Sequence, residues 1–190
     1  MRSRSRIRWA VPVLLALPLL PLLSACGDDD VAPRTPLPTA PAEALWNPCS
    51  ALDLAEVGDL FDERYRVDTG TDTEPRCTFT PGADGGTAVD VNYQLYDGTL
   101  KDVVAELPPP GEDATLTAPR LPDANGVRIL SSIDGDTLAV TGFVRNGRLV
   151  QVVNALDPTP FDRPRVVSGV REVLAALAAA ADESGLSGPN

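Results

Sequence analysis

Residues 127–153, VRILSSIDGDTLAVTGFVRNGRLVQVV, contain two signals for tight hairpin turns within a run of strand-forming residues. Asp134-Gly135 and Asn146-Gly147 each suit a two-residue type I′ turn, in which both central residues need a positive φ. Two such turns would join three strands into an antiparallel meander, and the turn length would set the register. In that register seven apolar side chains share one face: Val127, Ile129, Leu138, Val140, Val144, Leu149 and Val153. The stretch therefore predicts the centre of an antiparallel sheet with one apolar face.

The opposite face of this meander is mixed in character. The register places Phe143, Val150 and Val152 there, with Arg128 beside them. Because an exposed apolar strip on a soluble domain often marks a partner or ligand site, these four residues form a candidate binding face. Two other interpretations stay open: a loop or helix covers the strip, or the sheet curls around a cavity for an apolar ligand.

Segments before the meander add two strands and a short helix. Residues 76–80 have strand-forming character, and residues 88–96 alternate cleanly between apolar and polar side chains, as in a half-buried strand. Residues 99–107 predict one or two helical turns, which the prolines at 108–110 would stop. The stretch from there to Pro122 is expected to be a loop. The sheet should therefore contain about five strands.

Two further helices flank the strands. The first is predicted over residues 51–62, with Ser50 as its N-cap and Asp53 completing a pattern like a capping box. Its apolar residues at helical spacing are Leu54, Val57 and Phe61. The second is longer: Asp162 can cap it, Pro164 suits its first turn, and Ser184-Gly185 should end it. Its apolar stripe consists of Val166, Val170, Val173, Leu174, Leu177 and Ala181. This order of elements predicts an α+β fold, an antiparallel sheet with helices packed on one face.

The first residues of the chain carry a targeting pattern. Four arginines within residues 2–8 precede an apolar run over residues 9–23, which is shorter than the roughly twenty residues that a spanning helix needs. Leu23-Ser24-Ala25-Cys26 follows directly and resembles the lipobox of bacterial lipoproteins. The resemblance implies cleavage before Cys26, a diacylglycerol thioether on its sulfur, and a membrane-anchored protein on the outer face of the cell membrane.

The expected organisation follows from this pattern. Residues 1–25 would be the signal peptide, and residues 26–45 a lipidated, proline-rich and disordered tether. One globular α+β domain is expected over residues 46–183, with a flexible tail over 184–190.

Two cysteines remain in the domain, Cys49 and Cys77. Outside the cytoplasm, an even pair in a small domain predicts a disulfide, here one that closes a 29-residue loop. A zinc site would need further Cys or His ligands, and the chain has no histidine. A redox pair usually has the closer C-x-x-C spacing. A structural disulfide that staples the domain is therefore expected.

A family resemblance can be stated on these residues. The lipobox, the proline-rich spacer, the segment Asn47-Pro48-Cys49-Ser50-Ala51-Leu52 at the start of a helix, and a second cysteine on the next predicted strand are similar to the small cysteine-paired lipoproteins of high-GC Gram-positive bacteria. Most of that family is a domain of unknown function. The resemblance implies an extracytoplasmic lipoprotein with a disulfide and implies no catalytic residues.

The charge narrows the possible partners. Residues 1–25 hold four of the 16 basic residues and none of the 27 acidic ones, so residues 26–190 carry 12 against 27, a formal net charge of −15. Such a surface repels nucleic acid and anionic headgroups. We therefore expect contact with the membrane through the lipid on Cys26, a possible protein or apolar ligand, and no nucleic acid.

The sequence offers little catalytic or metal-binding machinery. Histidine, the commonest general base, is absent, and no G-x-S-x-G motif is present. Aspartates cluster in predicted turns: Asp84, Asp97, Asp123, Asp134 and Asp136. The segments 134–136 and 68–72 could supply oxygen ligands to calcium, although neither provides a full set. No cofactor or metal site is predicted.

We therefore expect a non-enzymatic binding or interaction module. The alternative is a lipid or small-molecule carrier with an apolar pocket between sheet and helix. A third hypothesis is an enzyme that uses paired carboxylates.

Overall fold

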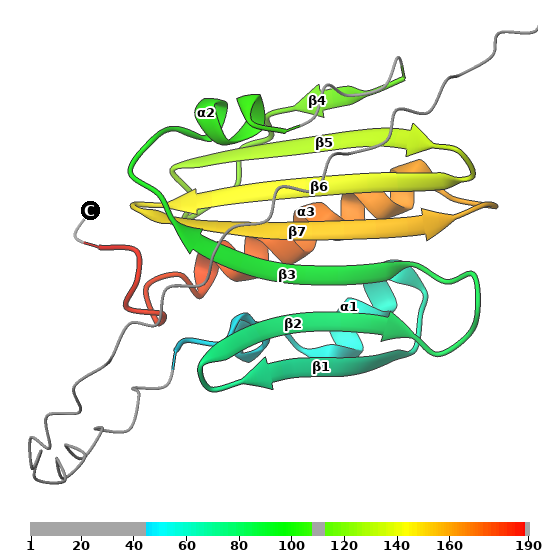
Figure 1. The fold of residues 1–190 in the computed structure, drawn as a ribbon, viewed down its shortest axis with the longest axis horizontal. Helices are drawn as coiled ribbons and strands as arrows, with labels where there is room; N and C mark the ends of the chain where they lie inside the picture. Colours follow the sequence, from blue (N-terminus) through cyan, green and yellow to red (C-terminus); the bar gives the residue numbers. More distant parts are fainter. Residues whose placement is uncertain (1–44, 108–112, 189–190) are drawn as a thin grey trace, which may run out of the picture. The chain divides into compact units, whose positions relative to one another are not determined.

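The computed structural model describes residues 45–107 and 113–188. Cys26, the predicted signal peptide and residues 26–44 of the predicted tether lie outside these residues. The described part contains a seven-stranded antiparallel sheet in the order β1-β2-β3-β7-β6-β5-β4 (Figure 1). Its strands are β1 (Tyr65–Thr71), β2 (Glu74–Pro81), β3 (Ala88–Leu95), β4 (Thr115–Thr117), β5 (Gly126–Asp134), β6 (Thr137–Asn146) and β7 (Leu149–Pro158).

The prediction of an α+β fold with an antiparallel sheet is confirmed, but the expected five strands omit both edges. Edge strand β1 carries Asp68 and Gly70, which interrupt the alternation of side chains and lie at an irregularity in the pairing with β2. Edge strand β4 has only three residues, all exposed, and lies in the segment predicted as a loop. Since neither edge strand has a clean apolar alternation, sequence periodicity could not reveal them.

The two hairpins of the meander form one residue later than predicted. Asp134 pairs with Thr137 and Asn146 with Leu149, so the turn residues are 135–136 and 147–148. Gly135 and Gly147 take the positive φ, at 56° and 57°. Moving a turn by one position shifts the strand register by two residues, and an even shift leaves every side chain on its predicted face. The division of the meander into two faces is therefore confirmed.

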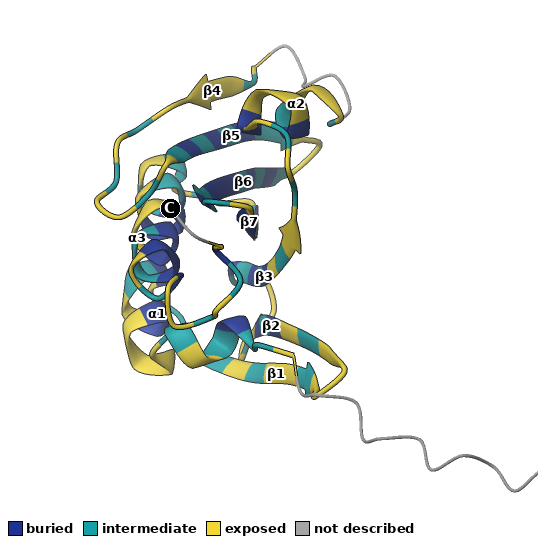
Figure 2. Ribbon diagram, turned by 90° about the vertical axis from the view of Figure 1, so that its left-hand side faces the viewer, coloured by how far each residue is buried: buried dark blue, intermediate teal, exposed yellow. Residues whose placement is uncertain are grey.

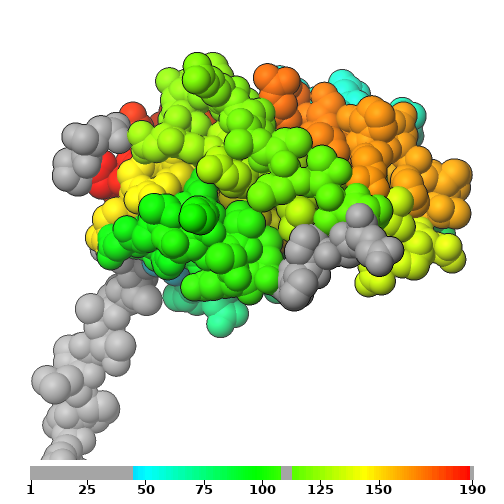
Figure 3. Space-filling view, turned by 90° about the horizontal axis from the view of Figure 1, so that it is seen from above, coloured from blue at the N-terminus to red at the C-terminus, as the bar shows by residue number. Residues whose placement is uncertain are grey.

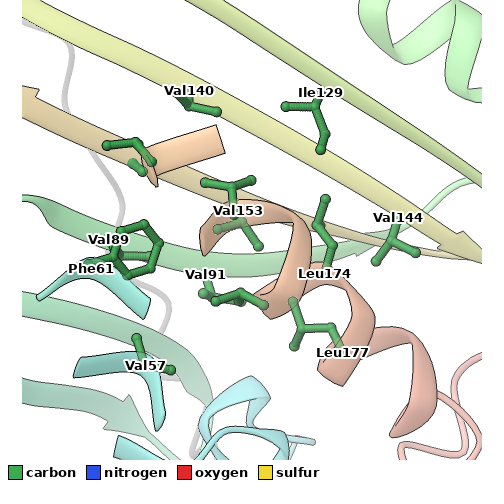
Figure 4. Packing of buried hydrophobic residues seen from close by; sticks show 14 of the residues in the cluster. Val57, Phe61, Val89, Val91, Ile129, Val140, Val144, Val153, Leu174 and Leu177 are labelled. Carbon is green, nitrogen blue, oxygen red and sulfur yellow. The ribbon is translucent and has the colours of Figure 1, made fainter. Parts of the chain in front are cut away.

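Helix α3 (Arg163–Ala179) packs across the apolar face of the sheet. Asp162 caps it as predicted, its side chain accepting a hydrogen bond from the Arg165 backbone N at 3.1 Å. Figure 4 shows Leu174 and Leu177 of α3 lying between the helix and the sheet, near Val144 and Val153. The helix ends at Ala179, before the predicted stop at Ser184-Gly185.

The chain beyond α3 contacts the β6–β7 turn at Ser187. The Arg148 backbone N donates to the Ser187 carbonyl at 3.0 Å, and Ser187 is buried. A flexible tail is predicted over residues 184–190, and within this segment Ser187 is buried beside the β6–β7 turn.

The predicted helix over residues 51–62 divides into two pieces, the 3-10 turn η1 (Pro48–Ala51) and helix α1 (Leu54–Phe61). Asp53, and not Ser50, is the N-cap of α1: its Oδ1 accepts from the backbone N of Ala55 and Glu56 at 2.8 and 3.0 Å. Leu54 is consequently the first helical residue and is 48% exposed, although the predicted apolar face included it. Val57 and Phe61 are buried as predicted.

The disulfide is present, as predicted. Cys49 in η1 and Cys77 in β2 are bonded, with their Cα atoms 5.1 Å apart. The bond therefore joins the start of the described chain to β2, which lies two strands away from β7 at the centre of the sheet.

Helix α2 (Leu100–Ala105) corrects the prediction that the helices share one face. Figure 2 shows α1 and α3 on one side of the sheet and α2 on the other. Seen from above in Figure 3, α3 (orange) and the green residues near position 100 likewise lie on opposite sides. Helices α1 and α3 therefore cover one face of the sheet, and α2 covers part of the other.

Two glycines allow the helices to approach closely. A Cβ at Gly142 of β6 would lie 2.6 Å from Val170 Cγ1 and 2.7 Å from Leu174 Cδ1 of α3. A Cβ at Gly169 of α3 would lie 2.7 Å from a ring carbon of Phe61 in α1. Because real Cβ atoms do not approach so closely, a side chain at either position would force its packed neighbours to move.

We predict that Gly142→Ala destabilises the domain by about 1–3 kcal/mol, because the added methyl overpacks the contact with α3. Urea unfolding of the two proteins measures the difference. Gly126→Ala is the matched control, since its Cβ would meet only Leu100 Cδ1 at 3.4 Å, and its stability should change by less than about 0.5 kcal/mol. Equal stability of the Gly142 variant and the wild type would show that the interface is looser than this geometry.

We also predict that the double variant Cys49→Ser, Cys77→Ser loses about 3–4 kcal/mol of stability, since the unfolded chain would regain the freedom of a 29-residue loop. Urea unfolding with and without reductant checks this. Reductant should destabilise the wild type and leave the double variant unchanged; the same unfolding curve for wild type in both conditions would contradict the prediction.

Candidate functional site

The predicted binding face is assembled by the register, but α2 covers its apolar part. Arg128 pairs with Phe143 and Phe143 with Val152, and Val150 lies on the same face. Leu100 and Val103 of α2 pack on this strip and leave Phe143 only 3% exposed. Of the interpretations given above for the apolar strip, the structure therefore agrees with the one in which a helix covers it.

A capping box holds α2 in this position. Thr99 Oγ1 accepts from the Asp102 backbone N at 3.3 Å, and Asp102 Oδ2 accepts from the Thr99 backbone N at 2.8 Å. The hydrogen bond from the Thr99 backbone N, followed by that from its hydroxyl, lowers the pKa of Asp102. Two of the four backbone N–H groups that lack a partner at the helix start are thus satisfied, which favours a helix of only six residues.

The rest of this outer face is polar. One row across the sheet contains Thr141, Asn154, Asp90 and Thr78 on successive strands. Thr141 Oγ1 donates to Asn154 Oδ1 at 3.1 Å, and Thr78 Oγ1 donates to Asp90 Oδ1 at 2.7 Å. These hydrogen-bonded side chains suit contact with water, so this half of the face needs no partner to cover it.

The aspartates considered for calcium have protein partners or occupy turns. Asp68 Oδ1 accepts from the Gly70 backbone N at 2.9 Å, and its Oδ2 pairs with Arg76 at 2.5 Å. The bond from Gly70, followed by that from Arg76, lowers the pKa of Asp68. Asp134 and Asp136 flank the glycine of the β5–β6 turn. Within residues 45–107 and 113–188, no three Asp, Glu or Cys side chains form a group that could hold a metal ion.

A polar cluster of Tyr65, Thr87 and Asp157 lies near the end of strand β7. Thr87 Oγ1 donates to Asp157 Oδ1 at 2.8 Å, and Tyr65 Oη donates to the Thr87 carbonyl at 2.8 Å. Burial, followed by the charge of Glu63, raises the pKa of Tyr65. Thr87 and Asp157 are 0% and 2% exposed, so no substrate can reach this hydroxyl–carboxylate pair in the folded protein. We interpret the cluster as structural.

A groove between α1 and α3 combines an apolar floor with an acidic rim, and has a volume of about 390 Å³. The floor residues are Leu52, Val57, Leu60, Val173 and Ala176. The rim residues are Asp53, Glu56, Asp59 and Glu172. Figure 2 shows the two helices next to each other on one side of the sheet. We call this feature the α1–α3 groove.

The local sequence explains how the groove forms. The cap at Asp53 starts α1 so that Val57 and Phe61 face the core, while Glu56 and Asp59 point outward and are exposed. The contact of Phe61 with Gly169 then fixes α1 beside α3. Glu172 of α3 consequently stands across the groove from the acids of α1.

The rim carboxylates do not neutralise their charge within the domain. Among the described residues, no salt bridge involves any of the four rim acids. All four rim acids are exposed, and Asp53 also accepts backbone hydrogen bonds as a helix cap. The groove is therefore an open, negatively charged site with an apolar base.

Sequence reasoning did not identify this site. The available signal was the spacing of Glu56 and Asp59, which lie three residues apart and so are neighbours on a helix surface, next to the cap at Asp53. The contribution of Glu172 depends on the packing of α1 against α3, which no local pattern reveals.

No protein-family model matches this chain, and a search of curated proteins found no match. Among the helices of residues 45–107 and 113–188, none has both the length and the apolar content needed to cross a bilayer. Any functional conclusion must therefore rest on the residues themselves.

We predict that Phe143→Ala destabilises the domain by about 3 kcal/mol, because it opens a cavity beneath α2. Leu156→Ala is the control: this residue lies on the same face of the sheet but is 50% exposed, and its loss should cost no more than about 0.5 kcal/mol. Chemical unfolding of both variants tests this. Equal stabilities would indicate that the strip at Phe143 is open to solvent.

Proposed function

We propose that this chain is an extracytoplasmic lipoprotein, anchored to the outer face of the cell membrane through Cys26, that acts as a non-enzymatic binding module. The observation that carries the proposal is the Cys49–Cys77 disulfide. Disulfides persist in oxidising compartments and are rare in the cytosol. The bond thus supports the extracytoplasmic location that the lipobox-like residues 23–26 imply.

The proposed anchor has a physical basis in the lipid chains. Each buried methylene contributes about 0.8 kcal/mol, so two acyl chains on Cys26 would hold the protein stably where a single chain would not. Proline-rich residues 26–45 would then act as a spacer, with a reach of roughly 60 Å at about 3.1 Å per residue. The same residues support the proposed membership of the cysteine-paired lipoproteins.

The absence of enzymatic activity is also part of the proposal. General acid–base chemistry needs a base within reach of substrate, and the chain has no histidine. The Thr87–Asp157 pair is buried, and Asp68 is bound by Arg76. Surface recognition demands none of this machinery, and the α1–α3 groove supplies a site for it.

The packing does not favour the alternative of a carrier with a pocket between sheet and helix. At Gly142 the space between β6 and α3 is too small for a methyl group. Val140, Val153 and Leu174 around it are completely buried. A ligand in this layer would have to displace core side chains, so binding at the surface is the simpler proposal.

The lipid anchor is tested by expression of the full chain in a bacterium that processes lipoproteins. We predict that the mature wild type begins at Cys26, that its N-terminal peptide carries the mass of a diacylglycerol thioether, and that it partitions into detergent. Cys26→Ser should carry no diacylglycerol mass, because the sulfur that forms the thioether is absent. Cys49→Ser, Cys77→Ser is the matched control, because it removes two sulfurs and leaves the anchor. A wild-type protein that retains Met1 or lacks the lipid would refute the anchor.

A further inference from the structure

We infer that the α1–α3 groove docks a cationic amphipathic helix of a partner protein, with its apolar side chains on the groove floor and its lysines or arginines against the acidic rim. This inference rests on the proposed function as a binding module and adds the chemical class of the ligand. Its evidence is the juxtaposition of an open apolar floor with carboxylates that have no cationic partner among the described residues.

The floor explains the apolar part of the ligand. Val57 and Val173 form its buried base, and Leu52, Leu60 and Ala176 are half-buried, so part of their apolar surface still contacts water. Covering such surface contributes about 25 cal/mol per Å². A volume of about 390 Å³ is at the small end of ligand sites and suits one or two anchoring side chains.

The two helices that form the groove explain the preference for a helical ligand. An amphipathic helix binds in a hydrophobic groove through apolar residues spaced three or four apart, so that one face provides the anchors. The positions next to those anchors then lie above the rim. Glu56 and Asp59 stand on one side and Glu172 on the other, so cations on either flank of the ligand helix would meet a carboxylate.

Charge excludes the competing occupants. A second copy of this chain would bring another strongly acidic surface to an acidic rim, which like-charge repulsion opposes. Anionic lipid headgroups and nucleic acid are repelled for the same reason. A neutral apolar molecule could fill the floor but would leave the rim carboxylates without a partner. A cationic amphipathic segment satisfies both features.

The test uses the complete mature chain and a synthetic probe. The probe is a helical peptide of leucine and lysine, about five turns long, with all leucines on one face. A peptide of leucine and glutamate with the same pattern tests the charge, and a peptide with the same lysines but serine for leucine tests the floor. Calorimetry measures the affinity, and NMR shift changes locate the peptide. We expect only the leucine–lysine peptide to bind, with shift changes at Leu60 and Ala176.

Two matched variants separate the groove from general electrostatics. Glu56→Gln, Asp59→Asn, Glu172→Gln neutralises three of the four rim carboxylates and keeps Asp53 as the helix cap. Asp84→Asn, Asp134→Asn, Asp136→Asn removes the same charge from exposed turns outside the groove. We expect the rim variant to lose affinity at least about tenfold relative to the turn variant. Added salt should weaken binding to the wild type more than to the rim variant.

Three results would overturn the inference: equal affinities of the two variants, shift changes away from the groove, or neither heat nor shift changes with the leucine–lysine peptide. A concentration-dependent dimer that the rim variant abolishes would also overturn it, since the occupant would then be a second copy. The readout is independent of the anchor. If Cys26 is lipidated but the peptide does not bind, only the proposed class of ligand is refuted. If the peptide binds but Cys26 is not lipidated, only the proposed anchor is refuted.

Discussion

The contact of α3 with the central strands is the constraint on which the rest of the structure depends. Gly142 of β6 lets Val170 and Leu174 of α3 pack close to the strand. Gly169, the residue before Val170, lets Phe61 of α1 pack close to α3. The position of α1 is therefore determined through α3 and not by the sheet alone. Since the groove is the space between these two helices, its width also follows from the absence of a side chain at Gly169.

The same contact explains why the two faces of the sheet differ. Once α3 and α1 cover the apolar face, the residual apolar strip at Phe143 needs only a small cover, and the six-residue helix α2 is sufficient. Beyond α2, the outer face is a row of paired threonine, asparagine and aspartate side chains that water can solvate. This division leaves the open apolar surface of the groove on the α1–α3 side, where the acidic rim surrounds it.

Much of the fold could be predicted from the sequence because face assignment depends on parity. The turns at Gly135 and Gly147 form one residue later than expected, yet the even register shift keeps Val127, Val140 and Val153 toward α3. The end of α3 could not be predicted in this way. Its last carbonyls are satisfied from the sheet: Gln151 Nε2 donates to the Leu177 carbonyl at 2.9 Å, and Asn146 Nδ2 donates to the Ala178 carbonyl at 3.3 Å. These long-range caps have no local sequence signal at Ala179, so the Ser184-Gly185 pattern placed the end of the helix too late.

The candidate site illustrates the same limit for function. Helical periodicity in residues 51–62 predicts which side of α1 is apolar, but the cap at Asp53 decides that Leu54 is exposed and that Glu56 and Asp59 border the groove. Glu172 joins them only through tertiary packing, across more than a hundred residues of sequence. An apolar floor provides non-directional affinity, whereas separated carboxylates select the orientation and charge of the ligand. A recognition site of this kind needs no catalytic residues, because its selectivity comes from the placement of charges around a buried contact.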